Sequence, residues 1–141
     1  MFVIETMCVR IICDKTGLPK FIFFVIIVLM KETLKDTTYK IIRLLVAEKY
    51  SELEEVTNGV RLNATEIAKI VAGYGKKLVV LPEDGFHLMN VVEVKNTNPK
   101  RWSVQIPLWT QEEGRSDLTL EMTVIDQKKD FSIELDNIHV L

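Results

Sequence analysis

The sequence predicts an α+β fold in which two helices pack on one face of a four-stranded antiparallel sheet. The main observation is a change of period: apolar residues recur at helical spacing in the first half and alternate with polar residues beyond Pro82. An alternating sheet has one apolar face, which helices are expected to cover. With 141 residues, of which 48% are hydrophobic, the chain can form one domain with its own core.

The first helix is predicted from about Leu34 to Lys49, where an apolar stripe has charged residues on its other side. The stripe is broad, which indicates that the helix packs on a large surface. Ser51 and Glu54 follow at the spacing of a capping box, so a short further turn of helix is expected there. Asn58–Gly59 then breaks the helical pattern.

The second helix is predicted to start at Asn63, because Glu66 follows at capping-box spacing. Gly73 or Gly75 supplies the left-handed residue that commonly ends a helix. The buried stripe of this helix consists of four residues at helical spacing, namely Ile67, Ile70, Val71 and Tyr74. This pattern therefore places the helix over about residues 64–74.

Four later segments alternate apolar and polar residues, as strands with one buried face do. Turn residues such as Asn96–Pro99 separate them, so consecutive strands are expected to pair as an antiparallel meander. Pro107 has no backbone N–H to donate and is expected near an edge or a bulge. The alternating segments are 92–94, 102–108, 118–124 and 131–135.

The connection between the second and third of these strands carries more functional groups than a turn needs to close. On a structural interpretation, Arg115 bridges Glu112 or Asp117 around Gly114, and Ser116 caps the turn. On a functional interpretation, the same side chains form a recognition site. The candidate binding residues are Trp109, Glu112, Glu113, Arg115 and Asp117.

Trp109 is expected to face away from Trp102 if the alternation continues that far along the strand. One tryptophan then lies in the core and the other on the polar face of the sheet. An exposed Trp beside Arg and carboxylates has the composition of an interface hot spot. The alternative is that Trp109 packs against the N-terminal segment or the last strand.

Residues that would support metal binding or catalysis are sparse. Cys8 and Cys13 do not have a metal-ligand spacing, and His87 and His139 are far from them in sequence. We therefore expect no metal, no other cofactor and no catalytic residue. The remaining catalytic alternative is a hydrolase that uses Glu112 or Glu113 as a general base, which requires a carboxylate with a raised pKa.

Charge is unevenly distributed along the chain. The net charge is −2, but residues 103–141 hold three basic and eight acidic residues, a balance of about −5. Such a surface repels phosphate groups and attracts basic groups. We therefore expect no binding to nucleic acid, and a basic protein as the partner.

Residues 1–29 form a hydrophobic extension before the predicted domain of residues 30–141. The run Phe21–Met30 holds ten apolar residues, about half of the roughly 20 that a membrane-spanning helix needs. Stable membrane insertion is therefore not expected, although an exposed run would allow weak membrane association. The favoured interpretation is that Met30 is the true start and that residues 1–29 are translated upstream sequence. The alternative is a β-hairpin that pairs Met7–Cys13 with Phe21–Leu29 through the turn at Asp14–Gly17.

The pattern Leu-Trp-Thr-x-Glu-Glu-Gly-Arg-Ser-Asp-Leu at residues 108–118 carries a family resemblance, together with Tyr74–Gly75, Arg101–Val104 and His139–Leu141. Through these segments residues 31–141 resemble a small uncharacterised bacterial domain family. The resemblance implies no assigned activity and no catalytic residues. In size, acidity and layout the chain is also similar to cytoplasmic immunity proteins that neutralise secreted bacterial toxins.

These observations favour a cytoplasmic, non-enzymatic protein-interaction module, of the immunity type, that meets its partner with the acidic side of the sheet and the connection Trp109–Asp117. The first alternative is a small-molecule binding domain in which Arg115 pairs an anionic ligand. A pocket of a few hundred Å³ under Trp109 and Arg115 would favour that alternative. A flat exposed patch would favour a protein partner.

Overall fold

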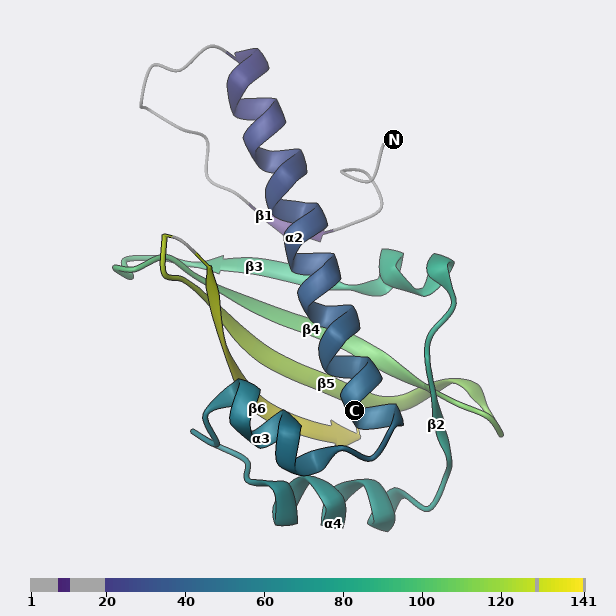
Figure 1. The fold of residues 1–141 in the computed structure, drawn as a ribbon. Coiled ribbons are helices and arrows are strands. Elements are labelled where there is room, and N and C mark those ends of the chain that lie inside the picture. The colour runs from purple at the N-terminus through teal and green to yellow at the C-terminus, as the bar shows by residue number, and fades with distance from the viewer. Residues whose placement is uncertain (1–7, 11–19, 129, 141) are drawn as a thin grey trace.

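The computed structural model describes residues 8–10, 20–128 and 130–140 (Figure 1). Helices precede most of the strands, and the strands then follow one another to the end of the described chain. The α+β prediction is therefore confirmed. In order, the elements are β1 (Cys8–Arg10), α2 (Lys20–Val46), α3 (Tyr50–Thr57), α4 (Ala64–Tyr74), β2 (Leu78–Val79), the 3₁₀-helix η1 (Glu83–Leu88), β3 (Asn90–Val94), β4 (Arg101–Thr110), β5 (Gly114–Asp126) and β6 (Phe131–Val140).

The sheet has the strand order β1-β3-β4-β5-β6, with β2 added against the far end of β4. Strands β3 to β6 form the predicted antiparallel meander. Its apolar residues lie opposite one another across β4 and β5, as Trp102 does to Val124 and Ile106 to Leu120. Two pairings were not predicted: β1 runs parallel to β3, and β2 runs antiparallel to β4.

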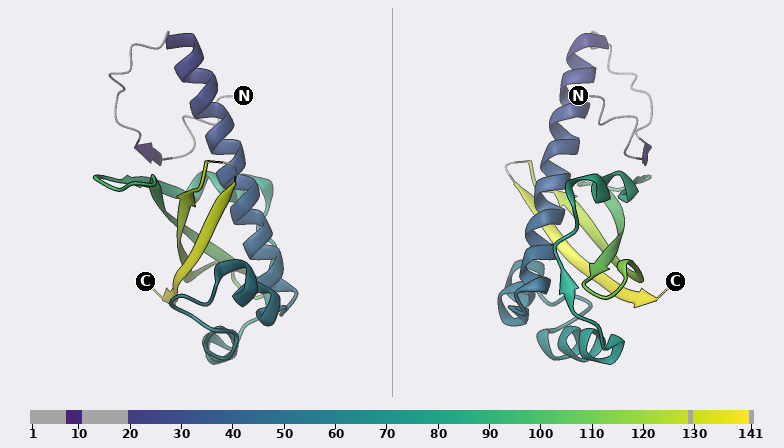
Figure 2. Two further views of the ribbon diagram at one scale, coloured as in Figure 1. Left: turned by 60° about the vertical axis from the view of Figure 1, so that its left-hand side comes forward. Right: turned by 90° about the vertical axis from the view of Figure 1, so that its right-hand side faces the viewer.

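Helix α2 lies across one face of this sheet, and α3 and α4 pack near the end of β6 (Figures 1 and 2). The core between them includes Ile41, Leu45, Leu53, Ile67 and Trp102, each at most 1% exposed. The short further turn of helix expected at Ser51–Glu54 is α3, an α-helix of its own. Within the described residues, no helix is long and apolar enough to span a membrane.

The β-hairpin alternative for the N-terminal segment is wrong. Residues 21–29 belong to α2, which continues without interruption through Met30. A helix satisfies its backbone hydrogen bonds internally, so the apolar run needs no partner strand. Of the other arm, Met7–Cys13, only Cys8–Arg10 lies within the described residues, and it pairs with β3 instead. That residues 1–29 are an extension of the domain stays a prediction.

The capping box at Asn63 is confirmed. Asn63 Oδ1 accepts a hydrogen bond from the Glu66 backbone N–H at 2.8 Å, and Glu66 Oε1 accepts one from the Asn63 backbone N–H at 3.3 Å. Gly75 ends α4 in the left-handed conformation, with φ of 76°. The two hydrogen bonds between Asn63 and Glu66 satisfy two N–H groups at the helix start that would otherwise be unpaired.

The capping box predicted at Ser51 is wrong. Ser51 lies inside α3, which starts one residue earlier, and the N-cap position is taken by Lys49 without a side-chain cap. Glu54 instead accepts a hydrogen bond from the Ala64 backbone N–H at 2.7 Å, which joins α3 to the first turn of α4. The residues just before α3 are bonded to the end of α2, since the Lys49 backbone N–H donates to the Leu44 carbonyl oxygen. The spacing of Ser51 and Glu54 does not contain this contact.

Pro107 lies at an irregularity of the sheet, as predicted. Strand β3 pairs with β4 as far as Gln105, and β2 pairs with β4 from Trp109 onward. On the other side of β4, the register with β5 shifts between Pro107 and Trp109. The pairing of β4 is therefore irregular near this proline, both toward β3 and β2 and toward β5.

Replacing Asn63 by Ala should destabilise the protein by about 1 kcal/mol, because the first turn of α4 loses its side-chain acceptor. The free energy of unfolding in denaturant measures this loss. Ser51→Ala is the matched control: Ser51 caps no helix, and Ala favours a helix more than Ser does, so stability should stay level or rise slightly. Equal losses in both variants would contradict the assignment of the caps.

Candidate functional site

The connection between β4 and β5 is a tight turn that closes on its own side chains. Thr110 ends β4 and is buried, and its hydroxyl accepts a hydrogen bond from the Glu113 backbone N–H at 3.0 Å. Gly114 begins β5 with a φ of 72°, a conformation that glycine adopts without strain. Because the turn is closed in this way, the charged side chains around it are free for other contacts.

Glu112 and Glu113 fasten this connection to the end of α4. The Glu112 carboxylate accepts a hydrogen bond from the Lys77 backbone N–H at 3.1 Å. Glu113 accepts one from the Tyr74 hydroxyl at 2.7 Å and forms an ion pair with Lys76 Nζ at 3.2 Å. Glu112 thus contacts the segment that follows α4, and its predicted ion pair with Arg115 is not formed among the described residues.

These contacts change the acidity of both partners. The hydrogen bond from Tyr74 holds the pKa of Glu113 below its usual value of 4.5, and the nearby Lys76 acts in the same direction. The same hydrogen bond raises the pKa of Tyr74 above its usual value of 10.0. A general base of the predicted kind needs a raised pKa, so Glu113 is unsuited to that role.

Trp109 packs against η1, which neither of its predicted alternatives included. Buried and half-buried residues alternate along all of β4, and Trp109 belongs to the half-buried set while Trp102 is 1% exposed. A Cβ atom at Gly85 in η1 would lie 3.1 Å from Trp109 Cη2 and 3.0 Å from Leu81 Cδ1. The tryptophan ring therefore lies tightly against a backbone position where an added methyl group would press on it.

Ser116 holds the irregular start of β5 in place. Its buried hydroxyl donates to the Leu108 carbonyl oxygen at 2.7 Å and accepts from the Leu118 backbone N–H at 3.1 Å. Its neighbours Arg115 and Asp117 are both exposed. Successive residues of a strand point to opposite sides, so burial of Ser116 turns these two side chains toward solvent.

Arg115 and Asp117 line a surface hollow of about 240 Å³ beside the β4–β5 irregularity. Within the part of the chain that the structure describes, neither side chain takes part in an ion pair. The predicted Arg115–Asp117 bridge is thus not formed. The other residues that line the hollow include Leu88, Asn90, Gln105, Pro107, Ser116 and Thr119.

Asn90 and Gln105 were missed as site residues because they belong to other strands. The signal that identifies them is the register, since a turn at Asn96–Pro99 places Asn90 opposite Gln105. Leu88 and Thr119 have no comparable local signal. They join the hollow through the positions of η1 and β5, which the sequence pattern did not supply.

Several acidic side chains of β5 and β6 are paired within the molecule. The Glu121 carboxylate lies 2.6 Å from His139 Nε2 and also accepts a hydrogen bond from the Gln105 amide. Arg61 Nε lies 2.8 Å from Asp136 Oδ1. A weaker pair joins Arg101 and Glu134 at 3.9 Å. The acidic side of the sheet therefore offers less free negative charge than the composition suggested.

His139 is part of this cross-strand network, because its Nε2 is paired with Glu121. Among the residues that the structure describes, no group of three His, Cys, Asp or Glu side chains is close enough to hold a metal ion. The chemistry available at the hollow is consequently that of one guanidinium, one carboxylate and neutral polar groups, with apolar walls.

Replacing Gly85 by Ala should destabilise the protein by about 1–3 kcal/mol, because the new methyl group overlaps Leu81 and Trp109. Gly73→Ala is the matched control: its Cβ meets nothing within 4 Å, and Ala in a helix stabilises by roughly 0.5–1 kcal/mol. Denaturant unfolding of both variants measures the difference. A stable Gly85→Ala variant would show that Trp109 is loosely packed.

The lowered pKa of Glu113 predicts an acid-dependent stability. This contribution is present above the usual pKa of 4.5 and is lost as the pH falls through the lower pKa of the folded protein. The parent should therefore lose more stability on acidification below about pH 5 than Glu113→Gln does. Glu55→Gln on α3 should follow the parent. Unfolding free energies across this pH range test the prediction, and parallel curves for the parent and Glu113→Gln would disprove it.

Comparison with known proteins identifies a family but no characterised relative. Residues 42–141 match DUF7668, a domain of unknown function. No curated protein and no solved structure matches the chain. The expected resemblance to an uncharacterised domain family is thereby confirmed, and the matched region holds α3, α4, the strands β2 to β6 and the hollow. The chain belongs to the DUF7668 family.

Proposed function

We propose that this chain is a non-enzymatic protein-interaction module whose contact site is the hollow beside the β4–β5 irregularity. The observation that carries the proposal is that the Arg115 and Asp117 side chains are exposed and, among the described residues, unpaired. Both side chains are exposed and line the hollow, and neither has an ion-pair partner in the described part of the chain. The charged neighbours Glu112 and Glu113 form hydrogen bonds within the molecule, to the Lys77 backbone and the Tyr74 hydroxyl.

The two free charges suit the recognition of a protein surface. The guanidinium of Arg115 presents a planar set of donors that can bind a carboxylate with two hydrogen bonds. The carboxylate of Asp117 accepts from a Lys, an Arg or a backbone N–H of the partner. Leu88 and Pro107 supply apolar contact beside these groups, as is usual for the centre of an interface.

The other three candidate residues act through the position of the connection. Trp109 fixes it against η1, and Glu112 and Glu113 fix it against α4. Rigid support of this kind lowers the entropy lost when a partner binds. We therefore assign contact roles to Arg115 and Asp117 and positioning roles to Trp109, Glu112 and Glu113.

The surplus of acidic residues in the last third of the chain supports a partner of net positive charge. Glu121, Glu134 and Asp136 are paired within the molecule. We therefore place the contact site at the hollow and not on the open face of the sheet. Among interaction modules, the size and acidity of the chain favour a bacterial immunity protein that binds a secreted toxin in the cytoplasm.

The hollow matches the predicted ligand pocket only in part: Arg115 lines it, but Trp109 does not. Ligand sites usually measure about 300–1,000 Å³, and this hollow measures about 240 Å³. It fits one side chain or a short turn of a larger partner better than a complete ligand. Binding of a small anion by Arg115 remains the second candidate, because the guanidinium is exposed and unpaired among the described residues.

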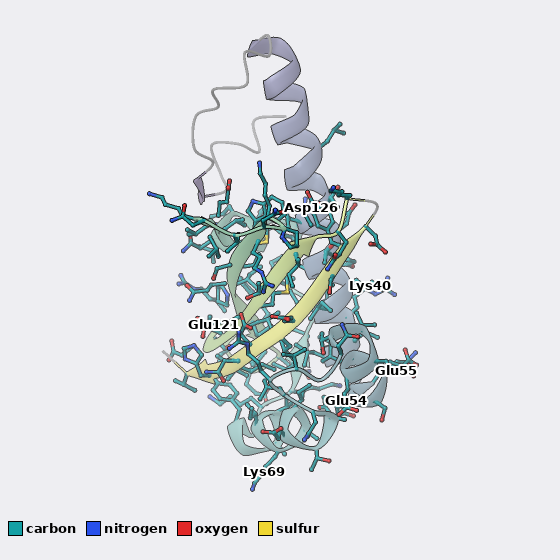
Figure 3. The ribbon with its side chains drawn as sticks, turned by 90° about the vertical axis from the view of Figure 1, so that its left-hand side faces the viewer. Lys40, Glu54, Glu55, Lys69, Glu121 and Asp126 are labelled. Atoms are coloured by element: carbon teal, nitrogen blue, oxygen red, sulfur yellow. The ribbon has the colours of Figure 1, made fainter. Side chains whose placement is uncertain are left out.

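Quantitative affinity capture from the native cytosol tests the proposal. The parent chain is compared with the double variant Arg115→Ala/Asp117→Ala and with the control Glu55→Ala/Lys69→Ala. Both double variants remove one positive and one negative charge, but Glu55 and Lys69 project from α3 and α4 (Figure 3). Thermal unfolding confirms that each variant is folded.

A protein partner should be retained by the parent and the control and reduced about tenfold or more by the site variant, the loss expected from two hot-spot contacts. Equal retention by all three proteins would show that the contact lies elsewhere. Loss of a bound metabolite with no protein retained by the parent would establish the small-molecule alternative.

A further inference from the structure

We propose that a cleft between α2, α3 and the start of β6 binds a free apolar amino acid such as leucine. The cleft has a volume of about 480 Å³ and shares no lining residue with the hollow beside the β4–β5 irregularity. It is therefore a second site, separate from the contact site of the proposed function. Its two opposite charges beside an apolar floor match a zwitterion with an apolar side chain.

Three elements line the cleft, so the packing of the fold fixes its shape. Thr37 and Lys40 of α2 form one wall, Val56 of α3 forms another, and Phe131 and Ile133 of β6 form the floor. Small-molecule sites usually measure about 300–1,000 Å³. The cleft, at about 480 Å³, lies within this range, whereas the hollow, at about 240 Å³, lies below it. By its size the cleft suits a complete small molecule.

The floor of the cleft is apolar. Ile133 is 6% exposed, and Val56 and Phe131 are half-buried. Trp102 supports this floor from the buried side, because its ring meets the Phe131 ring edge to face with 5.8 Å between the centroids. Covering these residues with an apolar group removes apolar surface from water, which favours binding. The ligand should therefore carry an aliphatic or aromatic side chain.

Trp102 also carries an unpaired polar atom. Its Nε1 is buried and has no hydrogen-bond acceptor among the residues that the structure describes. Nearly all buried N–H groups in native proteins are paired, and each exception calls for an explanation, such as a functional role. This unpaired donor belongs to the ring that packs on Phe131. It is a second observation that points to binding, as well as packing, in this region.

The α2 wall supplies hydrogen-bond donors for a carboxylate. Thr37 and Lys40 are three positions apart, so their side chains are neighbours on one face of the helix. Lys40 is exposed and projects from α2 (Figure 3), and it has no ion-pair partner in the described part of the chain. An ammonium group and a hydroxyl at this spacing can both donate to one carboxylate.

The β6 side of the cleft supplies an acceptor for an ammonium group. Asp130 lies just before β6, is exposed, and forms no ion pair with Lys40 or with any other described residue. Both charges are therefore available to a zwitterion, whose carboxylate meets Lys40 and whose ammonium group meets Asp130. A free α-amino acid carries these two groups on one carbon atom, and its side chain is left for the floor.

Calorimetric titration of the full chain with L-leucine tests the proposal. Each of three related probes lacks one recognised group: glycine lacks the apolar side chain, N-acetyl-leucine the ammonium group, and leucinamide the carboxylate. Leucine should bind saturably and at least about tenfold more tightly than each of them. No saturable binding of leucine at millimolar concentration, or equal binding of any of these probes, would overturn the proposal.

Two variants place the bound leucine in the cleft. Lys40→Met and Asp130→Asn each remove one charge and keep a side chain of similar length, so each should weaken leucine binding about tenfold or more. Lys69→Met on α4 and Glu55→Gln on α3 are the matched controls, because they remove the same charges outside the cleft. All four side chains are exposed, so the variants should stay folded, which thermal unfolding checks. Equal binding by a cleft variant and its control would contradict the assignment.

The double change Arg115→Ala/Asp117→Ala separates the cleft from the hollow. Neither residue lines the cleft, so leucine should bind to this variant as it binds to the parent. Loss of leucine binding in the variant would overturn the proposal, because the ligand would then lie in the hollow. Protein capture by the same variant reports on the proposed function alone, so the failure of one proposal is distinguishable from the failure of the other.

Discussion

The absence of a backbone N–H on Pro107 is the constraint on which the candidate site depends. β4 is an inner strand of the meander and has to pair on both sides, yet the proline cannot donate to a ladder. β3 stops pairing before it and β2 starts after it, and the register with β5 shifts beside it. A bulge re-aims the side chains of its strand, and here it leaves a hollow with Arg115 and Asp117 exposed at its border.

The connection after this irregularity divides its side chains between stability and recognition. Glu113 bonds to Tyr74, Ser116 bonds to two backbone groups, and Trp109 packs on η1. Arg115 and Asp117 make no comparable contact within the described residues. Their side chains therefore contribute little to the stability of the fold. Charged groups held in fixed positions without internal partners are what an interface requires, because they need not break a contact before they bind.

The features that the sequence pattern predicted correctly are local ones. The Asn63–Glu66 capping box spans one helical turn, and the alternation from Trp102 to Leu108 depends on neighbouring residues alone. Apart from the capping box at Ser51, which is local, the errors concern distant partners. Glu112 meets the Lys77 backbone across 35 positions, so a spacing argument paired its charge with Arg115 instead. The hairpin proposed for residues 7–29 is wrong because residues 21–29 are helical, and the partner of Cys8–Arg10 is β3, 82 positions further along.

Helix α2 supplies part of the core from residues that precede the region matched by the family. Leu34, Thr38 and Ile41 are at most 1% exposed, so the core draws on helix residues that precede the matched region. Leu29 is 61% exposed, and the helix beyond it extends past the sheet (Figure 2). Among the α2 residues whose burial is described, Leu34 is the first that is buried. The matched region therefore does not contain the whole core, because Leu34, Thr38 and Ile41 of the same helix complete it.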